Sequence, residues 1–171
     1  MLFGENVTLR PWSENDLSTL QSIRNNVSLQ RQLMSLPKGN SLDQIRDWLA
    51  NKTKSADTLF LVISNKTFIH AIGYIHVTNI DFLNRVGQLG ICIAPESQGK
   101  GYGSEAITLI ENYVRDAFLL RKITLQVLSN NSAAIHIYTK LGYANVGCLR
   151  KHFYFVSELV DVFIMEKFIR S

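Results

Sequence analysis

Two hydrophobic periods meet in the middle of the chain, between residues 86 and 118. From Val86 to Ile93, apolar side chains alternate with less apolar ones, and this period of two predicts a β-strand. One face of the strand carries Leu89, Ile91 and Ile93, and the other carries Gln88, Gly90 and Cys92. From Ser104 onward, apolar residues recur every three or four positions, which predicts an amphipathic helix. The apolar face of this helix consists of Ala106, Ile110, Tyr113, Val114 and Ala117.

The same two periods divide the rest of the chain into further elements. Strands are predicted over residues 7–10, 59–63, 71–78, 122–128, 143–149 and 158–168. Helices are predicted over residues 16–26, from a Ser41 cap to about residue 52, and over 133–141, with 27–40 irregular and 150–157 joining the last two strands. About seven strands and about four helices in this order predict a single α/β domain over residues 1–171, with a mixed, mostly antiparallel sheet.

Length and composition agree with one ordinary globular domain. The chain has 171 residues, of which 46% are hydrophobic and 19% are charged. No stretch approaches the roughly 20 apolar residues of a membrane span, and residues 1–10 lack the pattern of a signal peptide. Cys92 and Cys148 have no metal-ligand spacing. We expect two separate reduced thiols, no metal site and a cytoplasmic protein.

The net charge of +4 is compatible with more than one kind of anionic ligand. The basic residues are scattered, and no stripe of interleaved aromatic and basic residues is present, so nucleic acid is not expected as a partner. Without a membrane span, no membrane partner is expected either. A modest excess of Lys and Arg also suits a pocket for a polyanionic cofactor.

A glycine-rich segment, residues 98–103, joins the central strand to the helix that follows it. Its three glycines suit a sharp turn at which the backbone approaches a ligand closely. The free N–H groups and the positive dipole end of the next helix attract an anion. The junction therefore predicts a phosphate or pyrophosphate site. The simpler interpretation is a glycine turn that caps a helix.

Two common phosphate-binding patterns fit this segment poorly. A Walker loop would need glycine at position 94 and Ser or Thr at position 101, where the chain has Ala94 and Gly101. A dinucleotide-binding fingerprint should follow its strand directly, whereas Gly101 lies eight residues past Ile93.

Two motifs resemble the signatures of the GNAT superfamily of N-acetyltransferases. Residues 98–103, Gln-Gly-Lys-Gly-Tyr-Gly, match its Q/R-x-x-G-x-G/A loop. Residues 131–143 match its N-x-x-A-x-x-x-Y-x-K-x-G-F/Y pattern. Residues 9–11 and 24–25, Leu-Arg-Pro and Arg-Asn, resemble the branch that contains ribosomal-protein N-terminal, spermidine and amino-sugar acetyltransferases. The resemblance implies an N-acetyltransferase that uses acetyl-CoA as co-substrate.

The resemblance also implies how this cofactor is bound. The glycine loop would hold the pyrophosphate, and the pantetheine arm would lie in a gap between splayed strands 86–93 and 122–128. Gly90 is consistent with a bulge at that gap. The implied cofactor-binding residues are Ile91, Cys92, Ile93, Gln98, Gly99, Lys100, Gly101, Tyr102, Gly103, Ser104 and Asn131.

Tyr138 is the catalytic residue that the resemblance implies. A phenol near the sulfur can protonate the leaving thiolate, because thiols and phenols have comparable pKa values. The alternative is a core tyrosine, since Tyr138 shares a helical face with Ala134 and Leu141. Asn131 likewise could cap the helix, contact the cofactor, or do both.

No carboxylate stands where members of the superfamily often carry a general base. Gln126 and Gln88 occupy these two positions, and an amide cannot accept a proton at neutral pH. A water chain or another side chain could take the proton. The candidates by chemistry are His76, His136, His152 and Glu158, although each is also explained as a surface or hydrogen-bonded residue.

The amine acceptor is not fixed by these motifs. The net charge of +4 favours an anionic acceptor such as an amino-sugar nucleotide. The absence of a carboxylate general base favours an amine of low pKa, which both an amino sugar and a protein N-terminus have. A polyamine or other small amine is the alternative, and a catalytically silent acyl-CoA-binding module is the rival of another class. Trp12, Arg24 and Trp48 lie in the region expected to touch the acceptor, although both tryptophans could be core anchors. A monomer or homodimer is expected.

Overall fold

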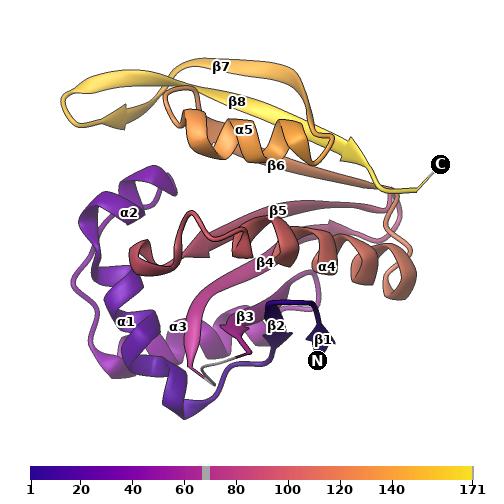
Figure 1. The fold of residues 1–171 in the computed structure, drawn as a ribbon. Coiled ribbons are helices and arrows are strands. Elements are labelled where there is room, and N and C mark those ends of the chain that lie inside the picture. The colour runs from indigo at the N-terminus through magenta and orange to yellow at the C-terminus, as the bar shows by residue number, and fades with distance from the viewer. Residues whose placement is uncertain (67–69, 171) are drawn as a thin grey trace.

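The computed structural model describes residues 1–66 and 70–170, in which eight strands form one sheet (Figure 1). The strand order is β1-β2-β3-β4-β5-β6-β8-β7, and β5 with β6 is the one parallel pair among the described residues. The strands are β1 (Leu2–Phe3), β2 (Val7–Arg10), β3 (Leu59–Asn65), β4 (Ala71–Asp81), β5 (Val86–Ile93), β6 (Lys122–Leu128), β7 (Ala144–Phe155) and β8 (Glu158–Phe168). This confirms the predicted mixed, mostly antiparallel α/β architecture.

Five α-helices accompany the sheet in the described residues, against about four predicted. They are α1 (Leu17–Asn25), α2 (Val27–Gln32), α3 (Leu42–Lys54), α4 (Tyr102–Ala117) and α5 (Ser132–Lys140), with short 3₁₀ turns η1 (Glu14–Asp16) and η2 (Pro95–Ser97). The predicted capping box of α3 is confirmed, because the Ser41 hydroxyl accepts from the Gln44 amide and the Gln44 side chain accepts from the Ser41 amide.

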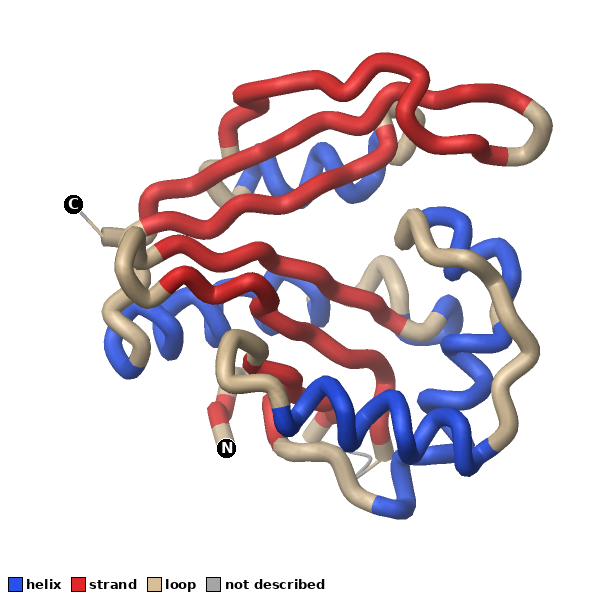
Figure 2. Tube along the Cα trace, turned by 180° about the vertical axis from the view of Figure 1, so that it is seen from behind, coloured by secondary structure: helices blue, strands red, loops and turns tan. Residues whose placement is uncertain are grey.

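The helices cover both faces of the sheet (Figures 1 and 2). On the face in front in Figure 1, α4 buries Ile107 and Ile110 in the same core as Leu89 of β5. On the opposite face, α1 and α3 pack in a second core that contains Tyr74 and Cys92. Both faces of β5 are therefore buried, each in a different core. The face with Cys92, which is less apolar in the sequence, packs under α1 and α3. Ala117, predicted on the buried face of α4, is exposed because it ends the helix.

β5 and β6 separate along their length, as the resemblance implied. They pair in parallel over Val86–Gln88 and Lys122–Thr124. From Leu89 to Ile93, β5 has no strand partner on this side among the described residues, whereas β6 continues to pair with β8 as far as Leu128. The sheet is therefore open between β5 and β6 at the end that leads into the glycine loop.

A buried polar cluster joins the two halves of the sheet near the end at which β5 and β6 are still paired. The carboxylate of Glu111, on α4, accepts a hydrogen bond of 2.7 Å from the Tyr143 hydroxyl and one of 2.5 Å from the Lys167 ammonium of β8. Glu111 is only 5% exposed, so these two donors offset the cost of removing its side chain from water. The cluster ties α4, which packs on β5, to the unit formed by β6, β8 and β7.

Two short elements were not predicted. Residues 27–32 were expected to be irregular but form α2, because the Asn26 side chain accepts from the Leu29 amide and caps the helix while Leu29 is buried. β1 has only two residues and pairs with β2, so it is too short to show a period.

The end of the chain also differs from the prediction. β7 does not stop at residue 149 but continues to Phe155, with a register shift between Leu149 and Phe153. Lys151 has φ of 47° at this shift, and its amide donates to the Asp161 carboxylate of β8 at 2.7 Å. A bulge therefore hid the continuation of the strand from the alternating pattern.

Gly90 lies in regular pairing opposite His76, so a bulge at this position is wrong. The register shift between β4 and β5 instead falls between Thr78 and Asp81. Gly90 is needed for space, because a Cβ there would lie 2.2 Å from Nε2 of His76.

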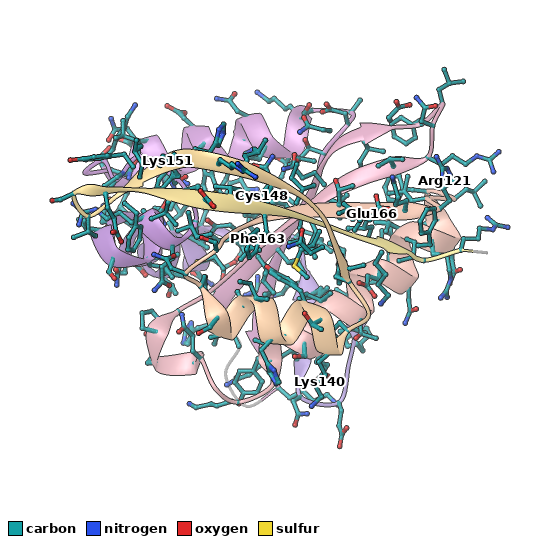
Figure 3. All side chains as sticks on the ribbon, turned by 90° about the horizontal axis from the view of Figure 1, so that it is seen from above. Arg121, Lys140, Cys148, Lys151, Phe163 and Glu166 are labelled. Carbon is teal, nitrogen blue, oxygen red and sulfur yellow. The ribbon has the colours of Figure 1, made fainter. Side chains whose placement is uncertain are left out.

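Cys92 is buried and Cys148 is exposed, and both are free thiols, as predicted. Figure 3 looks down on β7 and β8, where Cys148 and Phe163 are partners on adjacent strands. In the described part of the chain, no helix is long and apolar enough to cross a membrane.

The Glu111 cluster generates a stability prediction. Glu111→Ala should lower the free energy of unfolding by about 3 kcal/mol, because it leaves the Tyr143 hydroxyl and the Lys167 ammonium without their acceptor. Tyr143→Phe removes one donor but keeps the ion pair, so it should cost about 1 kcal/mol. Urea denaturation measures both values, and equal losses for the two variants would contradict the assigned role of the carboxylate.

Candidate active site

A cavity of about 940 Å³ lies where β5 and β6 separate. Its walls come from both layers of the molecule: α4 and α5 contribute on one face of the sheet, and α1, α2 and α3 contribute on the other. The cavity therefore connects the glycine loop with the helical region before β3. We call the part lined by α1, α2, α3 and β4 the acceptor end, and the part lined by the glycine loop, α4 and α5 the cofactor end.

The glycine loop presents free backbone N–H groups at the start of α4. Gly99 and Gly101 have φ of 74° and 81°, a region that glycine adopts without strain. A Cβ at either glycine would meet nothing within 4 Å, so the space above the loop is open. The amides of residues 99–104 have no acceptor within the described residues, and the first bond into the turn is from the Glu105 amide to the Gly101 carbonyl. This arrangement suits a phosphate group.

Two side chains brace the loop. The Gln98 amide donates to the carbonyl of Ile93 at 2.9 Å and so ties the loop to the end of β5. The Lys100 ammonium donates to the carbonyl of Glu96 at 3.0 Å. Lys100 is not part of the cavity wall, in contrast to the other residues predicted to bind the cofactor. Those that line the cavity are Ile91, Cys92, Ile93, Gln98, Gly99, Gly101, Tyr102, Gly103, Ser104 and Asn131.

These features fit a CoA thioester. The free amides and the dipole of α4 match its pyrophosphate, and the unpaired edge of β5 from Leu89 to Ile93 offers backbone groups to the amides of a pantetheine arm. The roles of individual residues as cofactor contacts stay predictions.

Tyr138 lies on the cavity wall, on α5. Its ring packs edge-on against Tyr143 at 5.7 Å between centroids, and its hydroxyl has no hydrogen-bond partner in the described part of the chain. Burial raises the pKa of Tyr138 to about 12, so the phenol keeps its proton throughout the neutral range. The packing of the ring therefore does not exclude a role for the hydroxyl as general acid, and that role stays a prediction.

Asn131 caps α5, because its side-chain oxygen accepts from the Ala134 amide at 3.2 Å. Since Asn131 also lines the cavity, the cap does not exclude a contact with the cofactor.

Gln88 and Gln126 both line the cavity, so the two expected base positions are where the resemblance implied. The Gln88 side-chain oxygen accepts from the Asn79 amide group at 3.0 Å. Among the described residues that line the cavity, none is Asp or Glu. A carboxylate base is therefore absent from the whole described cavity wall and not only from these two positions.

Of the other candidates for the base, His76 lines the cavity, whereas His136, His152 and Glu158 do not. Burial, with a smaller contribution from the charge of Lys52, lowers the pKa of His76 to about 4. Its Nδ1 is buried without a partner within the described residues. His76 is therefore a neutral imidazole that can accept a hydrogen bond but holds a proton weakly at neutral pH.

The acceptor end includes residues that the sequence did not single out. They are Leu29, Gln32, Leu33, Met34, Ser35 and Lys52. All but Lys52 lie in or just after α2. This helix is too short to show an apolar period, so the sequence pattern did not predict it.

Of the three residues expected near the acceptor, Arg24 and Trp48 line the cavity, and Trp12 packs against the core of α1 and α3. Trp48 also contacts the rings of Phe60 and Tyr74 at 5.3 and 5.5 Å, so it serves both the core and the cavity.

The sheet that opens between two parallel strands, the free amides at the start of α4 and the tyrosine on α5 define an acyl-CoA-dependent acyltransferase site. The model of the acetyltransferase (GNAT) domain matches residues 6–144. The chain belongs to this family, and it is an N-acetyltransferase with acetyl-CoA as co-substrate.

Similar proteins cover nearly the whole chain. Spermidine N(1)-acetyltransferase of Vibrio cholerae is 29% identical over 158 residues, which are 91% of this chain and 89% of the relative. The crystal structure of spermidine N-acetyltransferase from Vibrio cholerae in complex with CoA and spermine has a TM-score of 0.89 at 25% identity, and the match covers 96% of each chain. A dodecameric structure of spermidine N-acetyltransferase from this organism has a TM-score of 0.81 at 25% identity, covering 97% of this chain and 95% of the other. The expected monomer or homodimer is therefore not confirmed.

The glycine loop generates a prediction for cofactor binding. Gly103→Val should abolish CoA binding, because the added side chain would fill the space between the start of α4 and β5. The fold should remain cooperative, since a Cβ at this position would lie at an ordinary 3.9 Å from Ile91 and Ile93. Calorimetric titration with CoA measures the effect. Gly39→Val is the matched control, because a Cβ there has open space and Gly39 is not part of the cavity.

Proposed function

We propose that this protein acetylates a primary amine of a small molecule by direct attack on acetyl-CoA, with Tyr138 as the general acid. The observation that carries the proposal is the cavity through the open sheet, with free amides at one end and Tyr138 on its wall. Acetyl-CoA supplies an acyl thioester, and the protein must orient it, bring a neutral amine to it and provide a proton for the leaving thiolate.

The names of the relatives favour one of the acceptors left open by the sequence. They support the polyamine alternative more than an amino-sugar nucleotide or a protein N-terminus. Spermidine is therefore the reference acceptor for any assay of this protein.

Tyr138 is suited to donate a proton within a partly dry site. Its raised pKa makes it a weaker acid than an exposed phenol, but burial also raises the basicity of a thiolate that forms beside it. Because burial shifts the pKa of the phenol and that of the thiolate's conjugate acid in the same direction, it does not widen the gap between them, and the phenol can still serve as the proton donor as the thiolate develops.

Tyr138→Phe should lower kcat by roughly 100- to 10,000-fold, which is the usual cost of losing a general acid. The affinity for CoA should change little, because the ring packing against Tyr143 is kept. Thiol release with spermidine and other amines measures kcat, and calorimetry measures the affinity for CoA. An unchanged kcat, with chemistry shown to limit turnover, would leave Tyr138 only a packing role.

The absence of a carboxylate from the described cavity wall predicts how the rate depends on pH. The value of kcat/KM should rise with pH until the acceptor amine itself is deprotonated, near pH 8 for an α-amino group and near about 10.4 for an alkyl amine. The measurement is a pH–rate profile for a dipeptide and for spermidine. If kcat/KM rises over the same pH range with both acceptors, an ionisable group of the enzyme, and not the amine, controls the proton transfer.

A further inference from the structure

The acceptor end of the cavity contains a guanidinium without an anionic partner. Arg24, on α1, stacks over the ring of Trp48 with its Cζ 4.3 Å from the ring centroid. Its Nε is buried and has no hydrogen-bond partner, and Arg24 forms no ion pair within the described residues. Since a guanidinium cannot lose its proton, this desolvated donor is left without an acceptor among the described residues.

The titratable groups beside Arg24 do not neutralise it. The guanidinium interacts with the hydroxyl of Tyr74 and the thiol of Cys92, both in the core beneath α1 and α3. Burial raises the pKa of Tyr74 above its usual value and that of Cys92 to about 12, so both groups stay neutral at physiological pH. The positive charge of Arg24 therefore remains uncompensated by its neighbours.

A second cation strengthens the positive field. Lys52, on α3, also lines the acceptor end, and its charge is felt by His76 on β4. Arg24 and Lys52 are the charged residues of the described cavity wall, and no Asp or Glu offsets them. A polycation such as spermidine would be repelled here, whereas an anionic group would be attracted.

The cofactor phosphates do not account for this pair of charges. The glycine loop leads into α4, which packs on one face of the sheet with Ile91 and Ile93. Arg24 and Lys52 come from α1 and α3, which pack on the opposite face (Figure 2). The glycine loop and the pair of cations are thus associated with opposite faces of the sheet.

We infer that the acceptor of this enzyme is a primary amine that also carries an acidic group, a carboxylate or a phosphate, and that Arg24 binds this group with Lys52 as the second cation. The inference rests on the proposed acetyl transfer and narrows its substrate class. Arg24 is suited to the role because its planar fork of donors is held in place by the Trp48 ring.

The test compares matched pairs of amines with the purified chain and acetyl-CoA. Glucosamine against glucosamine 6-phosphate isolates a phosphate, 4-aminobutyrate against its amide isolates a carboxylate, and spermidine represents a polycation. The value of kcat/KM, measured by thiol release, should be at least about tenfold higher for the acidic member of one pair than for its neutral member. The pair that shows this difference identifies the acidic group as a phosphate or a carboxylate.

Arg24→Gln should then lower kcat/KM for that acidic amine by about 10- to 100-fold, mainly through KM, and leave its neutral partner unchanged. Arg24→Lys should restore part of the loss. Arg31→Gln removes the same charge from the exposed side of α2, outside the cavity, and should have no effect. CoA affinity by calorimetry should be equal in all variants.

The outcomes separate the inference from the proposed function. If spermidine is the best acceptor and Arg24→Gln leaves it unchanged or improves it, the inference is overturned and the acetyl transfer stands. If CoA binds but no amine in the panel releases thiol, the proposed transfer to small amines fails, and the inference fails with it.

Discussion

The separation of β5 from β6 is the constraint on which the rest of the structure depends. The two strands pair over three residues of each, and beyond Gln88 the backbone of β5 has no strand partner on that side in the described part of the chain. An unpaired strand edge in a protein interior is unfavourable unless another molecule or water satisfies it. Here the opening lets one cavity reach both faces of the sheet. A cofactor held at the start of α4 can therefore meet an acceptor that enters from the side of α1, α2 and α3.

Such an opening requires that the two halves of the sheet be held together elsewhere. The parallel pairing at Val86–Gln88 closes one end, and the Glu111 cluster adds a buried tie from α4 to Tyr143 and Lys167. Tyr143 also packs against the ring of Tyr138, so the same contact that joins the halves restricts the position of the phenol. Tyr143 therefore contributes both to the stability of the fold and to the position of the Tyr138 side chain.

The sequence predicted the parts of this arrangement that depend on local pattern. The alternation of β6 gave its bounds. The glycine loop and Asn131 were recognisable because their residue types are tied to turn and cap geometry. Elements shaped by tertiary contacts were not predictable: α2 depends on one cap and one buried leucine, and β7 continues through a bulge. Arg24 and Trp48 were expected near the acceptor, but the stacking of one on the other was not predictable, because it joins α1 and α3, which no local pattern places side by side.

The absence of carboxylates from the described cavity wall and the two cations at the acceptor end have the same effect on the electrostatic potential of the cavity: both make it more positive. A carboxylate base would stabilise an ammonium ion and would also repel an acidic group on the acceptor. Arg24 and Lys52 have the opposite effect: they disfavour the charged form of an amine nearby and so lower its pKa, while they attract an acidic group on the same molecule. His76, kept neutral by burial and by Lys52, adds a hydrogen-bond acceptor without adding negative charge. The field of such a cavity therefore favours the neutral, reactive form of the amine, which agrees with the absence of Asp and Glu from its described wall.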